Sequence, residues 1–270
     1  MATSVASTTD RMVSIGRVFS RAFATMASNP LTVFGISFLF GALPGVIMNY
    51  VAQNLGYSQQ NLATGAITPL YFYTIFAVII ILGIVFAMLT QGALVRATVA
   101  HSEGRNASFG ESAMAGLQVA LPLFVLGILL GLGVTLGFLL LIVPGIILYL
   151  MWAVAAPALV EEQAGVFEAF GRSRYLTKGA RWKILALGLI MLVIYWIFSA
   201  VAGVALVTIY GVQGLAAAVQ QGLPLTWLAV SAVISTILTA IIATIQTSLY
   251  IELRDWKDGP GSEALSEVFA

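Results

Sequence analysis

The chain lacks cysteine entirely and has few charges, and these two shortages exclude many kinds of chemistry. Of its 270 residues none is Cys, one is His, and only 9% are Asp, Glu, Lys or Arg. Without thiols a protein has no disulfides, no thiolate metal ligands and no cysteine nucleophile. A net charge of +1 gives no electrostatic attraction for nucleic acid. We therefore expect no metal, no cofactor and no nucleic-acid partner.

Catalytic motifs are missing as well. The single histidine, His101, stands in AHSEGRN beside Glu103, in a segment that we expect to be a solvated loop. The chain contains no HExxH, no arguable Ser-His-Asp set and no phosphate-binding glycine loop followed by Lys. The sequence therefore predicts a protein that is not an enzyme.

The chain is rich in apolar residues, which make up 60% of it and give a mean hydropathy of +1.01. Three stretches carry no charge at all, residues 22–95, 112–160 and 184–251. A helix needs roughly 20 residues to cross the ~30 Å hydrocarbon core, so each stretch has room for two crossings. We predict an all-α polytopic membrane protein with six transmembrane helices arranged as three hairpins.

The expected spans are residues 30–51, 71–94, 113–132, 138–160, 184–207 and 225–249. The middle hairpin leaves almost no outer loop, and we place its turn near Gly133–Gly137. The chain then divides into an N-terminal segment (1–29) with a surface helix, a transmembrane domain (30–251) and a short tail (252–270).

All charged residues fall in four segments, 10–21, 96–111, 161–183 and the tail from 252, and each segment contains Lys or Arg. The positive-inside rule places such segments in the cytoplasm. Both termini are therefore expected to be cytoplasmic. The first residues have no apolar core before a small-residue cleavage site, so we expect no cleaved signal peptide.

Two charged segments are candidates for contact with anionic lipid. Residues 10–29 have a helical period with one apolar face, and their polar face includes Arg17 and Arg21. This cytoplasmic helix either binds lipid or a partner, or anchors the first span. The second segment carries Arg172, Arg174, Lys178, Arg181 and Lys183. These five residues either attract lipid phosphates or only set the topology.

Proline-glycine pairs occur inside two of the expected spans. LPGVIMNY (43–50) contains Pro44 and Gly45, and VPGIILYL (143–150) contains Pro144 and Gly145. We expect both pairs at similar depth, ~9 Å below the outer surface at 1.5 Å per residue. Each proline removes one helical hydrogen bond. The pairs either frame a binding cavity or are kinks that help the helices pack.

Small residues recur at the spacing of helix contacts. Gly127 with Gly131, and Gly133 with Gly137, each form a GxxxG pattern, which lets backbones approach closely. In the last span the residues at four-residue spacing are Ser231, Ser235, Thr239, Ala243 and Thr247. This stripe suits helix packing or, alternatively, a polar pore.

Residues 139–184 carry a family resemblance. Pro144-Gly145 is followed by Trp152 and Pro157, by Glu161 or Glu162, and then by Gly165, Ala169, Arg172-Ser173, Leu176 and Gly179. This stretch resembles a bacterial six-helix family named for the membrane domain of some glycerophosphoryl diester phosphodiesterases, to which the YciC-like inner-membrane proteins are related. The resemblance implies an all-α protein of the bacterial inner membrane. Phosphodiesterase chemistry belongs to a separate soluble domain with several His residues, whereas this chain has one His.

Together these features favour a non-enzymatic, multi-pass inner-membrane protein that organises the membrane or acts as an accessory factor. Its expected partners are anionic lipids at the cytoplasmic face, with a protein partner or a second copy of the chain also open. The alternative is a transporter or channel for a lipid-like or uncharged small solute, and it depends on the paired Pro-Gly sites.

Overall fold

The computed structural model describes residues 13–56, 59–221 and 224–259, and every regular element in these ranges is a helix. The elements are α1 (Ile15–Ser28), α2 (Pro30–Ile36), the π-helical segment η2 (Ser37–Ala42), α3 (Leu43–Asn54), α4 (Gln59–Ala63), α5 (Pro69–Ser102), α6 (Phe109–Leu140), α7 (Ile142–Met151), α8 (Ala155–Glu162), α9 (Val166–Thr177), α10 (Arg181–Gln221) and α11 (Leu225–Asp258).

Six segments of the described chain are long and apolar enough to cross a membrane, which confirms the predicted all-α polytopic fold. They are Pro30–Asn54, Pro69–Ser102, Phe109–Leu140, Ile142–Glu162, Arg181–Gly211 and Leu225–Asp258. Most extend beyond the expected spans, and the last helix continues through Asp258 into the charged tail. Residues 10–12 of the expected surface helix and 260–270 of the tail lie outside the described residues.

The turn of the middle hairpin lies further along the chain than the sequence suggested. α6 is helical through Gly133–Gly137, and the chain reverses at Leu141, which has extended backbone angles. The prediction of a turn at Gly133–Gly137 is therefore wrong. Pro144 is consequently the third residue of α7, where a missing N–H costs no hydrogen bond. The mid-span break predicted at Pro144-Gly145, and its depth matched to Pro44, are wrong for the same reason.

The fourth span is instead interrupted ten residues after its start. α7 ends at Met151 and α8 begins at Ala155, with non-helical residues between them. In the first span the distortion does accompany the proline, because the π-helical segment η2 ends just before Leu43 and Pro44. π-Helical segments of this kind are rare and occur often at functional sites.

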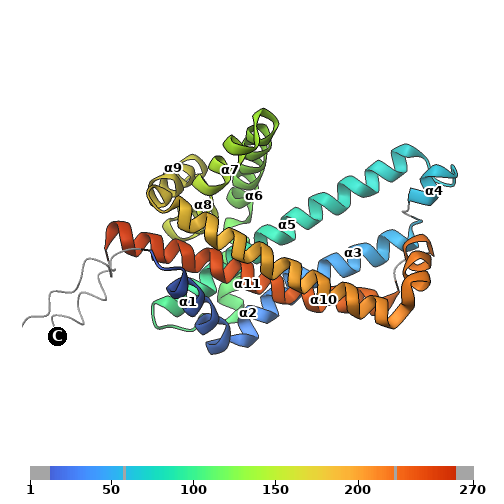
Figure 1. The fold of residues 1–270 in the computed structure, drawn as a ribbon, viewed down its shortest axis with the longest axis horizontal. Helices are drawn as coiled ribbons and strands as arrows, with labels where there is room; N and C mark the ends of the chain where they lie inside the picture. The colour runs from blue at the N-terminus through green and yellow to red at the C-terminus, as the bar shows by residue number, and fades with distance from the viewer. Residues whose placement is uncertain (1–12, 57–58, 222–223, 260–270) are drawn as a thin grey trace, which may run out of the picture.

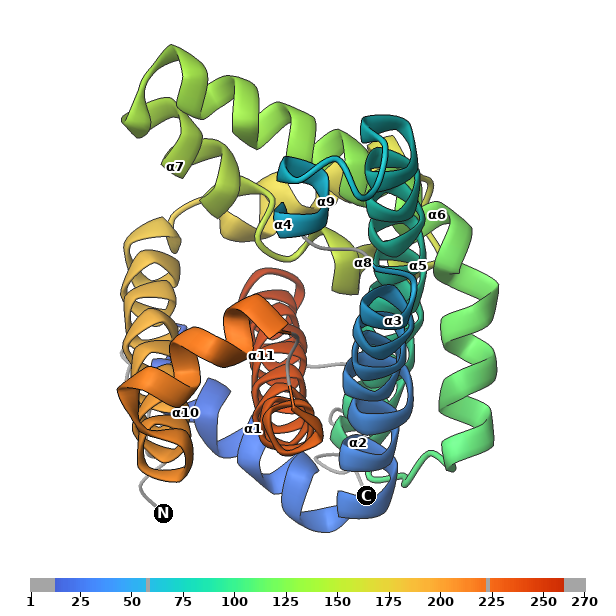
Figure 2. The ribbon, with the colours of Figure 1, turned by 90° about the vertical axis from the view of Figure 1, so that its right-hand side faces the viewer.

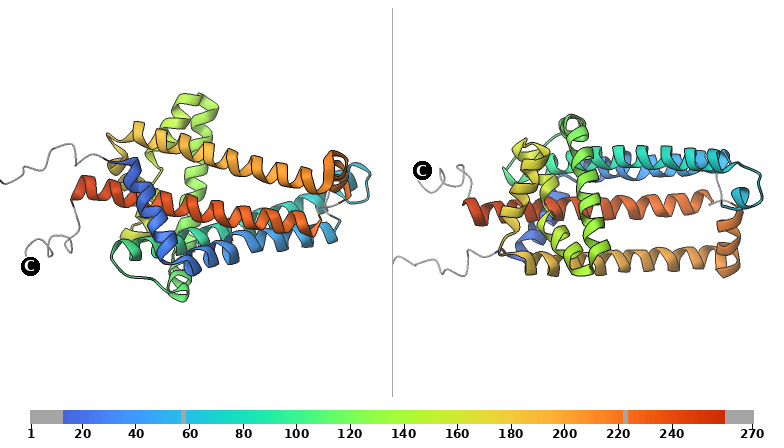
Figure 3. Two further views of the ribbon diagram at one scale, coloured as in Figure 1. Left: turned by 60° about the horizontal axis from the view of Figure 1, so that its bottom comes forward. Right: turned by 90° about the horizontal axis from the view of Figure 1, so that it is seen from above.

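The long helices α5, α10 and α11 run along the long axis of the molecule, whereas the α6–α7 hairpin lies across them (Figure 1). The view along that axis shows α10, α11 and the α3–α5 pair side by side, with α7 and the adjoining part of α6 crossing above them (Figure 2). α1, α8 and α9 gather at the end of the molecule where α11 terminates, and α4 lies at the opposite end (Figure 3).

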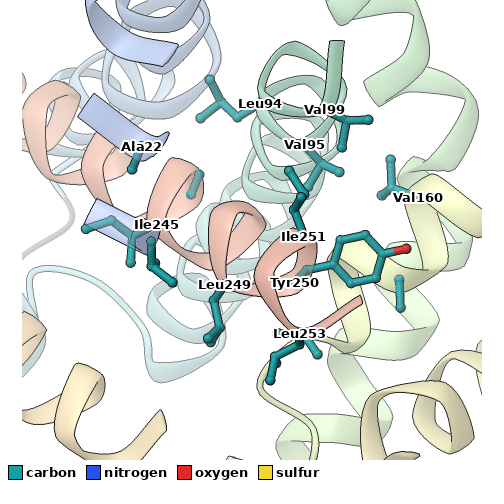
Figure 4. Close-up of a cluster of buried hydrophobic side chains, with 14 of the residues drawn as sticks. Ala22, Leu94, Val95, Val99, Val160, Ile245, Leu249, Tyr250, Ile251 and Leu253 are labelled. Carbon is teal, nitrogen blue, oxygen red and sulfur yellow. The ribbon is translucent and has the colours of Figure 1, made fainter. Parts of the chain in front are cut away.

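The hydrophobic core lies at the end that carries the charged segments. Figure 4 shows Tyr250, Leu249 and Ile251 of α11 packed beside Val95 and Val99 of α5 and Val160 of α8. Tyr250 is fully buried. The apolar side chains toward the opposite end are largely exposed, as on α5 at Ile81 and α10 at Trp196, which suits a surface that contacts lipid chains.

Candidate functional site

The corner between α9 and α10 brings three basic residues together. Arg174 lies in the last turn of α9, Lys178 follows that helix, and Arg181 begins α10. The chain turns sharply at Gly179, whose φ of +93° suits only glycine without strain. A Cβ atom there would also lie 3.1 Å from the Trp256 ring of α11. Gly179 therefore fixes the corner against α11.

These side chains surround a surface pocket of about 370 Å³, which we name the headgroup pocket. It is lined by Arg174, Lys178, Gly179, Arg181 and Trp182. Among the described residues none of its three basic side chains forms an ion pair, and the buried Nε of Arg181 has no hydrogen-bond partner. Trp182 is 84% exposed. The pocket thus offers positive charge and unused donors beside an aromatic ring that suits a membrane interface.

The other four predicted lipid-binding residues bond within the protein. Arg17 pairs with Glu252 at 2.6 Å and Arg21 with Asp255 at 3.3 Å. Lys183 Nζ donates to the Val13 carbonyl at 2.7 Å. These three contacts connect the region of α1 to α10 and α11, and they leave the buried Nη1 of Arg21 without a hydrogen-bond partner.

Arg172 belongs to the same charged network. Its guanidinium pairs with Glu162 at 2.7 Å and with the carboxylate of Asp258. The hydrogen bonds that the Arg172 guanidinium donates to the Asp258 carboxylate contribute most to raising the pKa of Arg172 above its ordinary value, so the charge is fully retained. Arg172 thus ties α8 and α9 to the end of α11 and lies outside the headgroup pocket.

Helix α1 is held by its contacts with α11. The carboxylate of Glu252, only 4% exposed, accepts hydrogen bonds from the Ser14 N–H at 2.9 Å and from Arg17 Nε at 2.8 Å. Val18, Ala22 and Met26 are buried on the apolar face of α1. Of the two sequence interpretations of this helix, the contacts favour the anchor.

At the break between α7 and α8, polar side chains from other helices form hydrogen bonds with backbone N–H and carbonyl groups. The Ser173 hydroxyl donates to the Met151 carbonyl at 2.9 Å and accepts from the Val154 N–H at 3.3 Å. The amide of Gln246 donates to the Ala153 carbonyl at 2.8 Å. Sequence reasoning missed this role, because a Ser in a charged segment looks like a solvated residue. The available signal was Ser173 and Thr177 spaced four apart on one helix face.

The Pro44-Gly45 site borders two partly open pockets between helices. One, of about 300 Å³, includes Gly45, Asn49, Ser231 and Ser235 in its lining. The other, of about 290 Å³, lies between the η2–α3 segment of the first span, α5 and α11. Its lining includes Pro44, Gly45, Thr90, Gln91 and Thr239. The Ser/Thr stripe of α11 thus both packs against the first span and lines these pockets.

Pro144 and Gly145 serve a different purpose, because Gly145 lies against α6. A Cβ atom on Gly145 would lie 2.5 Å from the Phe138 ring, and one on Gly137 would lie 2.9 Å from the Gly145 Cα atom. This pair of glycines lets the α6 and α7 backbones touch. The packing interpretation of Pro144-Gly145 is the one that these contacts support.

His101 and the acidic side chains are the remaining groups of chemical interest. His101 Nδ1 lies 3.0 Å from the Ser28 hydroxyl, and the described residues contain no group of three or more His, Asp or Glu side chains that could hold a metal ion. The three basic side chains of the headgroup pocket give it the positive charge that attracts an anion. Comparison with models of known protein families, with curated proteins and with solved structures gave no match.

Proposed function

We propose that the protein is a non-enzymatic integral membrane protein that binds anionic phospholipid at its Lys/Arg-rich end and acts as a membrane-organising or accessory factor. The observation that carries this proposal is the headgroup pocket, where Arg174, Lys178 and Arg181 converge. On the positive-inside rule this end faces the cytoplasm. With the resemblance of residues 139–184, that favours the cytoplasmic membrane of a bacterium.

Electrostatics and local structure both support a phosphate group as the ligand. Each basic residue near an anionic surface contributes about 1 kcal/mol to lipid attraction. The pocket lies at the start of α10, where the helix dipole also favours an anion. The exposed ring of Trp182 suits the level of the lipid headgroups.

The test compares lipid binding before and after the pocket loses its charge. The full chain is purified in mild detergent, delipidated and titrated with phosphatidylglycerol or phosphatidylcholine, and bound lipid is measured by native mass spectrometry. We expect the triple variant R174Q/K178Q/R181Q to bind phosphatidylglycerol on the order of 100-fold more weakly, because about 1 kcal/mol per residue is about fivefold.

A matched control distinguishes the loss of the pocket's own charges from a general loss of positive charge at this end of the protein. R96Q/R105Q/K183Q also removes three positive charges from the same end of the protein, but none of these residues lines the pocket. This control is expected to retain phosphatidylglycerol binding within a few-fold. Equal losses in the two triple variants would contradict a specific headgroup site.

The pockets beside Gly45 favour a second candidate function, transport of an uncharged or lipid-like solute. Their linings combine apolar side chains with Asn49, Gln91 and hydroxyls, and the π-helical distortion lies next to them. The lipids, solutes and proteins that co-purify from native membrane discriminate the two functions. A retained uncharged solute supports transport, whereas retained anionic lipid or a stoichiometric protein supports the accessory role.

A further inference from the structure

We infer that the headgroup pocket continues into an acyl-chain groove, so that one anionic diacyl phospholipid is held by head and tail; this inference rests on the proposed function. The groove is a pocket of about 340 Å³ between α10, α11 and the break that separates α7 from α8. On α10 its lining is Ile184, Leu187, Gly188, Met191, Leu192 and Tyr195.

The linings of the headgroup pocket and the groove share no residue, but they follow one another along α10. Arg181, Gly188 and Leu192 are spaced seven and four residues apart and therefore share one face of α10. Arg181 lines the headgroup pocket, and the other two line the groove. From Arg181 to Tyr195 the helix rises ~21 Å at 1.5 Å per residue. Half of a ~30 Å hydrocarbon core is ~15 Å, so the groove can follow an acyl chain through one leaflet.

The surface of the groove suits hydrocarbon. Ile184 and Leu187 are buried aliphatic side chains in its lining. The one amide there, Gln246, is already bonded, because its Nε2 donates to the Ala153 carbonyl at 2.8 Å and its Oε1 accepts from Gln91 at 3.0 Å. α10 and α11 lie side by side (Figures 1 and 2), and residues of both helices line the groove. The basic end and the apolar wall together match the two parts of a phospholipid.

Gly188 provides a means to block the groove without disturbing the fold. A Cβ atom built there meets no other atom within 4 Å, so a larger side chain extends into the groove rather than into a neighbouring helix. Gly203, further along α10, is equally open and does not line the groove. Gly188→Leu and Gly203→Leu are therefore a matched test and control. Leu192→Trp narrows the groove from the same wall and serves as a second blocking variant.

The measurement compares two phosphatidylglycerols that share a headgroup, one with palmitoyl and oleoyl chains and one with two hexanoyl chains. Each is titrated into the delipidated full chain in detergent, with bound lipid counted by native mass spectrometry. We expect the unaltered protein to bind the long-chain lipid at least about tenfold more tightly, which corresponds to about 1.4 kcal/mol. Gly188→Leu and Leu192→Trp are expected to abolish this preference without changing the short-chain affinity, whereas Gly203→Leu is expected to retain it.

The possible failures are distinguishable. If both blocking variants keep the chain-length preference of the unaltered protein, the groove does not hold the acyl chain, and this inference is overturned. If the unaltered protein shows no chain-length preference, the acyl-chain groove is overturned. If R174Q/K178Q/R181Q nevertheless binds phosphatidylglycerol more weakly than the unaltered protein, the headgroup site of the proposed function still holds. If that triple variant binds like the unaltered protein, the proposed function itself fails.

Discussion

At the scale of single residues, two glycines in the same sequence pattern have unlike surroundings. A Cβ atom on Gly137 would lie 2.9 Å from the Gly145 backbone, whereas one on Gly131 would meet nothing within 4 Å. Both glycines end a GxxxG pattern. A GxxxG pattern makes a close approach between two helix backbones possible. Whether the approach occurs depends on where the neighbouring helix lies.

Gly137→Ala and Gly131→Ala therefore have opposite expected effects on stability. The first forces the α6 and α7 backbones apart and is expected to lower the free energy of unfolding by about 1–3 kcal/mol, as overpacking does. The second fills open space and is expected to be neutral or to stabilise the helix by about 0.5–1 kcal/mol. Unfolding of the purified variants in detergent measures both, and equal changes would contradict this assignment.

At the scale of elements, the fourth span depends on side chains from other helices. The carbonyls of Met151 and Ala153 and the N–H of Val154 are satisfied by Ser173 and Gln246 rather than by a continuous helix. In a membrane an unsatisfied backbone group is costly, so an interrupted helix needs such partners. α9 and α11 are thus part of what makes this span stable.

Ser173→Ala is expected to destabilise the protein by about 1–3 kcal/mol, because it leaves the buried Val154 N–H unpaired. The Met151 carbonyl keeps the hydrogen bond from the Thr177 hydroxyl at 3.3 Å. Ser231→Ala is the matched control, since the Ser231 hydroxyl donates only to the Leu228 carbonyl of its own helix at 2.9 Å. The control is expected to change stability little. Denaturant unfolding in detergent compares the two variants, and an unchanged midpoint for Ser173→Ala would show that the break needs no such support.

At the scale of the whole molecule, charge is concentrated at one end. The ion pairs of α1, α8, α9 and α11 lie there, as does the headgroup pocket. The opposite end, with α4, carries no Lys or Arg. The α6–α7 hairpin does not extend toward that uncharged end but lies across the long helices (Figure 3).

The absence of cysteine makes this topology directly testable with single-cysteine variants. In intact cells a membrane-impermeant maleimide is expected to label Thr64→Cys, in the loop between α4 and α5, and not Ser102→Cys at the charged end. Leu141→Cys, at the tip of the α6–α7 hairpin, is expected to stay unlabelled because the tip lies beside the bundle. Labelling of Leu141→Cys from outside would mean that this hairpin stands upright across the bilayer, and labelling of Ser102→Cys would reverse the orientation.

The sequence by itself determined the number and type of the apolar helices and the grouping of charge. A charged side chain is costly in hydrocarbon, so uncharged stretches such as residues 22–95 mark where the spans lie. The distortion near Pro44 was also predictable, because proline removes a helical hydrogen bond wherever it lies inside a helix.

Tertiary structure alone decided which basic residues are available and where the fourth span breaks. Arg172 and Arg174 are two positions apart in one helix, yet within the described part of the chain only Arg172 pairs with carboxylates, one from α8 and one from α11. The sequence prediction of a mid-span break at Pro144 was wrong because the effect of a proline depends on where its helix begins, here at Ile142. These outcomes depend on which groups distant in sequence meet in space, and those contacts, rather than local propensity, supply the partners for buried charges and unpaired backbone groups.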